Sequence, residues 1–173
     1  MPELKVFIQN NIYNRFYKEV ERVGEALFEY IETESVMAEI EKVNLSNKSS
    51  QDVQDILLKK AVELGFQSEK RGLFSDISNS NLRPDYYKRI ETTGIIIEVE
   101  RGKTIMNNMD MLDFWKCHIF KVANHLFLFV PNELKHNLNS EPNNCFQKVS
   151  SRMAPFFEEG NYTNVHSLWL FGY

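Results

Sequence analysis

The ten residues Gly94–Lys103, GIIIEVERGK, constrain the fold more than any other part of the chain. Three consecutive isoleucines are typical of a strand that is buried in a core. Glu98 and Glu100 then follow two positions apart. Because side chains alternate between the two faces of a strand, both carboxylates lie on one face, while Ile97 and Val99 lie on the other. A strand with a strongly apolar start is therefore expected to end in two carboxylates on the same side.

The preceding residues, RPDYYKRI, predict the partner strand of a β-hairpin. A two-residue turn at 91–92 pairs Ile90 with Thr93 and, counting outward, places Asp85 opposite Glu98. The proline before Asp85 marks the start of the strand, because it forces its predecessor into extended geometry. A turn one residue longer would shift the register by one position and remove this pairing.

Three carboxylates that converge on a largely apolar sheet need a counter-charge, because like charges across strands are destabilising and buried carboxylates cost more still. Mg²⁺ is bound in proteins by one or two carboxylates together with substrate phosphates. Two glutamates on one strand are more often a solvated face, but the apolar neighbours favour a metal site here. Basic residues close in sequence that could meet phosphates or offset the charge are Arg83, Arg101, Lys103 and Lys116.

The sequence Pro84-Asp85, followed one hairpin later by Glu98-Val99-Glu100, resembles the PD-(D/E)xK nuclease superfamily, which has the restriction-endonuclease-like fold. The resemblance covers residues 51–131 and implies a core in the order αβββαβ. The sequence is similar to those type II restriction enzymes that carry Glu-x-Glu where the commoner motif ends in lysine. This resemblance implies that Asp85 and Glu98 bind the catalytic Mg²⁺, for which Mn²⁺ can substitute, and that Glu100 orients the attacking water or acts as general base.

The departure from the commoner motif leaves two possibilities open. Either Lys103 takes the role of the missing lysine, or the site is inactive. The resemblance also implies an acidic residue on the helix before the hairpin, and Glu63 is the candidate for this additional metal ligand.

The segment NNMDMLDFWKCHI, after the hairpin, is dense in polar groups for a helix beside a sheet. Lys116 and His118 are candidates for phosphate contacts, and Asp110 or Asp113 could support the site. Ordinary solvated positions between core residues explain this segment equally well.

Apolar periodicity predicts the remaining elements. Helices are expected at 12–31 (continuing or bending through 43), 51–64, 107–123 and 143–157, and further strands at 66–70, 125–131 and 165–171. The third of these helices carries its apolar side chains on one side, at Leu112, Trp115, Ile119 and Val122. The expected fold class is α/β (α+β), a central mixed sheet flanked by helices. One domain, residues 1–173, would comprise an N-terminal helical extension (1–45), the motif-bearing core (51–131) and a C-terminal helix and strand (140–173).

The composition limits the alternatives. At 173 residues, 43% hydrophobic and with a formal charge of −4, the chain is an ordinary globular sequence that does not coat nucleic acid by bulk electrostatics. Its two cysteines form no CxxC pair, which argues against a zinc site. No signal-like or membrane-length apolar segment stands in the sequence, so we expect a cytoplasmic protein without a membrane partner.

The converging carboxylates and the resemblance to the PD-(D/E)xK superfamily predict a Mg²⁺-dependent DNA endonuclease of restriction-enzyme type. A homodimer is expected, because one such site cuts one strand, with the long helix at 12–31 as its packing surface. Two alternatives remain: the same fold with a degraded site that binds nucleic acid or a protein partner, and a structural protein whose N-terminal helix mediates assembly. Mg²⁺-dependent cleavage separates the first from the others, and a salt-dependent DNA mobility shift without cleavage favours the second.

Overall fold

A six-stranded mixed β-sheet forms the centre of the computed structural model, which describes residues 1–10, 16–45, 49–68, 83–101, 104–105, 107–134 and 142–173. The strands lie in the order β1-β8-β5-β4-β3-β2; β8, β5 and β4 run parallel, and the other neighbours are antiparallel. Their bounds are Glu3–Ile8 (β1), Gln67–Ser68 (β2), Tyr86–Ile90 (β3), Thr93–Val99 (β4), His125–Val130 (β5) and Ser167–Gly172 (β8). A separate two-stranded ribbon joins Glu133–Leu134 (β6) to Asn143–Asn144 (β7).

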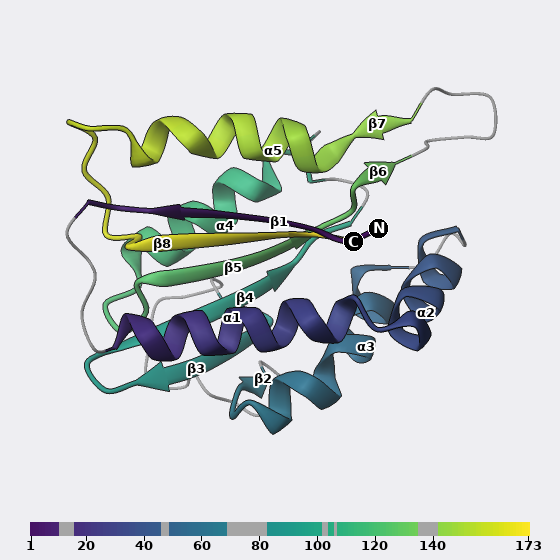
Figure 1. Cartoon of the computed structure of the whole chain (residues 1–173). Coiled ribbons are helices and arrows are strands. Elements are labelled where there is room, and N and C mark those ends of the chain that lie inside the picture. The colour runs from purple at the N-terminus through teal and green to yellow at the C-terminus, as the bar shows by residue number, and fades with distance from the viewer. Residues whose placement is uncertain (11–15, 46–48, 69–82, 102–103, 106, 135–141) are drawn as a thin grey trace.

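Helices cover both faces of this sheet, with α1, α2 and α3 on one side and α4 and α5 on the other (Figure 1). Their bounds are Tyr17–Ile31 (α1), Glu34–Leu45 (α2), Ser50–Glu63 (α3), Met109–Ile119 (α4) and Cys145–Met153 (α5), with a 3₁₀ turn, η2, at Ala154–Phe157. The fold class predicted from the sequence is thus confirmed. The order α3, β2, β3, β4, α4, β5 is also the αβββαβ order that the resemblance implies. Among the described residues, no helix has both the length and the apolar character needed to cross a membrane.

The N-terminal segment belongs to the sheet as well as to the helices. Residues 3–8, expected within a helical extension, form β1, which pairs antiparallel with β8. The predicted long helix is divided at Thr33, whose carbonyl oxygen accepts the first hydrogen bond of α2 from the Met37 N–H. The start of the predicted helix, 12–15, lies outside the described residues.

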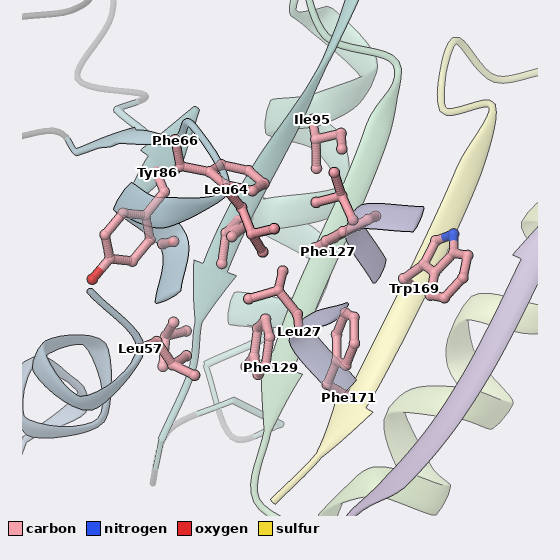
Figure 2. Close-up of a cluster of buried hydrophobic side chains, with 14 of the residues drawn as sticks. Leu27, Leu57, Leu64, Phe66, Tyr86, Ile95, Phe127, Phe129, Trp169 and Phe171 are labelled. Atoms are coloured by element: carbon pink, nitrogen blue, oxygen red, sulfur yellow. The ribbon is translucent and has the colours of Figure 1, made fainter. Parts of the chain in front are cut away.

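One apolar core lies between the sheet and α1–α3, and Figure 2 shows its aromatic centre around Leu27, Phe127 and Phe171. The helical positions that the sequence marks as apolar in α1 are fully buried there, at Val20, Val23, Leu27 and Ile31. Each such side chain contributes about 1.5–3 kcal/mol by its burial. The surface that was expected to pair two copies of the chain is therefore used inside one copy.

Helix α4 faces the sheet with a different side from the one predicted. Leu112, Trp115, Ile119 and Val122 were expected on the core side, but they are 43–53% exposed. The buried side of α4 consists of Asp110, Asp113, Phe114 and Cys117. The helical stripe 110–113–114–117 has the correct spacing for a core face, but half of its members are carboxylates, so the apolar pattern indicated the wrong side.

The hairpin has the predicted register. Ile90 pairs with Thr93 across a turn at 91–92, and Glu91 adopts a positive φ of 49°. Gly94 lies within β4, two residues after the turn. A Cβ atom at this position would come within 2.6 Å of the Tyr87 ring and 2.8 Å of two backbone carbonyl oxygens, so the glycine is required for close packing.

Candidate active site

The hairpin brings Asp85 to the end of β4, where Glu98 and Glu100 lie close to Asp113 of α4. The last ladder pair is Tyr86 with Ile97, which places Asp85 next to Glu98 in the predicted register. One carboxylate oxygen of Asp85, Oδ2, accepts a hydrogen bond of 2.8 Å from the backbone N–H of Val99. This bond fixes the carboxylate beside the strand end.

Helix α4 adds two residues to this group. The Lys116 ammonium lies 2.7 Å from Glu98 Oε1 and 3.2 Å from Asp113 Oδ1. Both carboxylates are almost inaccessible to solvent, with 3% of Glu98 and 1% of Asp113 exposed. The candidate site therefore consists of Asp85, Glu98, Glu100, Asp113 and Lys116, and we call these five residues the carboxylate cluster.

Burial makes ionisation of the cluster costly. It is the main cause that raises the pKa of Glu98 well above its usual range; the charge of Asp113 adds to the effect and Lys116 partly opposes it. Burial likewise raises the pKa of Asp113, against the opposing charge of Lys116. Burial alone would lower the pKa of Lys116, but the charges of Glu98 and Asp113 outweigh it and the net shift is upward. Lys116 is thus held firmly as a cation.

Glu100 has the pKa that most resembles that of a catalytic base. Burial, the charges of Asp113 and Asp85, and a carboxyl–carboxyl hydrogen bond to Asp113 raise it to about 8. With Glu100 ionised, Asp113 Oδ2 is a buried oxygen that has no donor among the described residues. A proton on Glu100, or a cation in its place, would satisfy that oxygen.

The donor set of the cluster suits Mg²⁺, since carboxylate oxygens are the ligands this hard cation prefers and, with Glu100 ionised, the buried Asp113 Oδ2 has no partner among the described residues. In the described parts of the chain, no three His, Cys, Asp or Glu side chains are placed to hold one metal ion together. This arrangement is compatible with Mg²⁺, which commonly takes one or two protein carboxylates and completes its shell with water and phosphates.

Glu63 is not brought to the cluster. It is the last residue of α3 and forms an exposed ion pair of 2.9 Å with Lys60. The part of α3 that lies near Asp85 is its N-terminal half, where Gln54 and Asp55 help to line a pocket of about 130 Å³. Glu63 thus lies about two turns from the part of α3 that approaches Asp85.

Of the predicted phosphate-binding residues, Lys116 lies in the cluster and Arg83 is exposed beside it, its carbonyl oxygen 3.4 Å from the Lys116 ammonium. Arg101 instead donates to the Asn44 carbonyl oxygen, which joins the end of β4 to α2.

His118 is used within the chain. Its Nδ1 accepts a hydrogen bond of 3.1 Å from the Asn164 N–H, and its ring packs edge-on against Trp115. Lys103 lies outside the described residues, so the structure gives no position for it.

The two supporting carboxylates considered on α4 have different surroundings. Asp113 belongs to the cluster, whereas Asp110 is fully buried 3.3 Å from the Arg152 guanidinium. A signal for their burial does exist in the sequence: Asp110, Asp113 and Cys117 follow at steps of three and four, which is the spacing of one helix face.

Comparison with known proteins gives little support at the level of sequence. No family profile and no curated protein matches the chain. Among solved structures, the chain is similar to the restriction endonuclease BglII complexed with a DNA 16-mer, with 12% identity and a TM-score of 0.43, over 99% of this chain and 77% of that chain. A likeness this distant carries no argument about function, which has to come from the cluster itself.

Proposed function

We propose that this protein is a Mg²⁺-dependent nuclease that hydrolyses DNA phosphodiester bonds, of the restriction-enzyme type. The observation that carries the proposal is the burial of Glu98 and Asp113 beside Asp85 and Glu100 at the end of a core strand, with Lys116 as their ammonium partner. Buried like charges are costly, so such a group persists where it serves a function.

Two features of the fold support this function. The carboxylates arise from the hairpin register that the PD-(D/E)xK resemblance requires, with Asp85 beside Glu98. The helix that closes over them, α4, is the element that follows the hairpin in the αβββαβ order.

The residues divide into three roles. Asp85 and Glu98 would hold the cation, which when bound supplies charge stabilisation for a phosphate and a more acidic water ligand. Glu100 takes the proton of the attacking water, and its pKa of about 8 suits a base that works near neutral pH. Lys116, on a flexible stem, would contact a phosphate oxygen after its ammonium leaves its carboxylate partners.

Incubation of plasmid DNA with the protein, in Mg²⁺ and in EDTA, tests the function. Nicked or linear plasmid is expected with Mg²⁺ or Mn²⁺ and none with EDTA. A salt-dependent mobility shift without cleavage in either metal would instead favour a binding module with an inactive site. Two observations favour this alternative. Lys116 already pairs with the carboxylates, and the described residues include no three side chains placed to bind one metal ion together.

We propose further that the functional unit is a homodimer that pairs through the outer face of α4. A double-strand cut is simplest with two sites related by a two-fold axis. The exposed apolar residues of this region are Leu112, Trp115, Ile119 and Val122. On α4 itself, Leu112, Trp115 and Ile119 follow at steps of three and four residues, which is the spacing of a helix–helix seam and is self-complementary when two identical helices pair.

Light scattering and plasmid cleavage together test this interface. A dimer is expected for the unmodified chain and a monomer for Trp115→Lys combined with Ile119→Lys, and the monomer should nick plasmid without linearising it. The matched control is Leu58→Lys combined with Val62→Lys, at exposed positions on α3, which should remain dimeric. A monomer for the unmodified chain, with and without duplex DNA, would remove the proposal.

A further inference from the structure

The ammonium of Lys116 is saturated by acceptors of the protein itself. It lies 2.7 Å from Glu98 Oε1, 3.2 Å from Asp113 Oδ1 and 3.4 Å from the Arg83 carbonyl oxygen. An ammonium has three N–H donors, so each of them has an acceptor here. With only 12% of its side chain exposed, Lys116 lies between two buried carboxylates, and one of them, Glu98, is a proposed ligand of the cation.

The cluster nevertheless keeps capacity for more positive charge. Among the described residues, the ion pairs of Glu98 and Asp113 are both made with Lys116. With Glu100 as a carboxylate, the buried Asp113 Oδ2 has no hydrogen-bond donor in the part of the chain that the structure describes. One ammonium thus neutralises part of the cluster, and a divalent ion would neutralise more of it.

We propose that Lys116 holds the cation position of the metal-free cluster and that a divalent cation binds only as this ammonium moves away from Glu98. The inference rests on the proposed function, because it takes Asp85 and Glu98 as the metal-binding carboxylates. An ammonium and a divalent ion on the same carboxylate oxygen repel each other strongly in a site with little water. The four-carbon stem lets the ammonium move while α4 stays in place, and a phosphate is the natural new partner for it.

A purely structural ion pair predicts a different behaviour. If Lys116 only stabilised the fold, its removal would leave two buried carboxylates unpaired, and metal affinity would stay the same or fall as the site loosens. If Lys116 competes with the metal ion for Glu98, removal of the lysine should raise the affinity for the metal. The sign of the change therefore separates the two accounts.

Calorimetric titration with Ca²⁺ and with Mn²⁺, without DNA, measures this sign. Lys116→Met keeps the length of the side chain and removes its charge, and we expect at least ~10-fold tighter metal binding, equivalent to about 1.4 kcal/mol. The control is Lys121→Met, at an exposed position just beyond α4, which should bind as the unmodified chain does. Unchanged or weaker binding by Lys116→Met would overturn the proposal, as would the absence of binding by both proteins.

A second measurement avoids any loss of folding in the variant. In the unmodified chain, the ¹³Cε and ¹⁵Nζ resonances of Lys116 are followed by NMR during titration with Ca²⁺. They are expected to shift towards values of a solvated ammonium as the metal site fills, while those of Lys121 stay constant. Saturation of the site with the Lys116 resonances unmoved would contradict displacement. Neither readout uses cleavage, so a protein that binds metal in this way but does not cut DNA would refute the nuclease and leave the competition standing.

Discussion

The two faces of strand β4 present opposite environments within one short segment. Ile95, Ile97 and Val99 pack into the apolar core beneath α1–α3 and are at most 2% exposed. On the other face, Glu98 and the following Glu100 lie beneath α4 among further charges. The apolar face stabilises the fold by burial, whereas the acidic face costs stability, and this difference indicates which face is present for function.

The largest expected effect comes from removing one carboxylate of the acidic face. Asp85→Asn and Glu98→Gln should each abolish detectable plasmid cleavage, because each unmakes the cation site. Both variants should remain folded, since repulsion within the cluster falls and Asp113 still pairs with Lys116. Glu25→Gln, at an exposed position on α1, is the control and should cut normally. Near-normal cleavage by either cluster variant would show that the ligands are assigned wrongly.

The corresponding change on the apolar face should act on stability alone. Ile97→Ala is expected to lower the free energy of unfolding by about 2–5 kcal/mol, and Ile97→Val by about 0.5–1.5 kcal/mol, because of the lost burial and the cavity. Urea denaturation measures both. Cleavage per folded molecule should be unchanged at low temperature. A folded Ile97→Ala that had lost its activity would show that the two faces are not independent.

Glu100 sharpens the comparison, because it lies on the acidic face but is not assigned as a metal ligand. Glu100→Ala should slow single-turnover cleavage by roughly 100-fold, the scale of a lost general base, while Mn²⁺ affinity stays within a few-fold. A variant with full activity would make Glu100 a bystander and return attention to Lys103, whose position the structure does not describe.

Smaller effects are expected in the dependence of stability on pH, with opposite signs for the two faces. Glu100 has its folded pKa raised from 4.5 to about 8, so the unfolded chain binds fewer protons in this window and stability falls as pH rises through it, by at most about 1.4 kcal/mol per pH unit. Glu100→Gln should remove this slope in metal-free urea titrations. An unchanged slope between pH 6.5 and 8 would contradict the assignment.

The apolar face holds a buried base, His125, whose Nδ1 lies 2.8 Å from Ser167 Oγ. Burial, with a smaller effect of His166, lowers its pKa from 6.5 to about 3. The unfolded chain therefore binds more protons between these values, and stability falls as pH drops through them. His125→Asn should weaken this loss of stability at acidic pH. A dependence of stability on pH identical to that of the unmodified chain would refute the assignment.

The sequence allowed the hairpin to be predicted in detail because its signals are local. A two-residue turn fixes the register and strand alternation then fixes the faces, so the order of residues alone brings Asp85, Glu98 and Glu100 together. The run from His125 to Val130 was predicted as a buried strand for a similarly local reason.

The features that were missed depend on contacts between distant segments. In α4 the apolar stripe through Trp115 and Ile119 indicated the core side, but the acidic end of β4 draws Asp113 and Lys116 inward and leaves that stripe exposed. Strand β1, residues 3–8, was missed because its partner, β8, lies at the other end of the chain. Neither outcome can be derived from periodicity alone.

Crystals soaked in Mn²⁺ and measured at its absorption edge test the central claim most directly, since the anomalous signal locates the ion without any assay of activity. If the carboxylate cluster is a cation site, an anomalous peak is expected in contact with Asp85 and Glu98, with the Lys116 ammonium displaced from Glu98. A map at saturating Mn²⁺ that shows no peak among these carboxylates, with Lys116 still paired to Glu98, would contradict it.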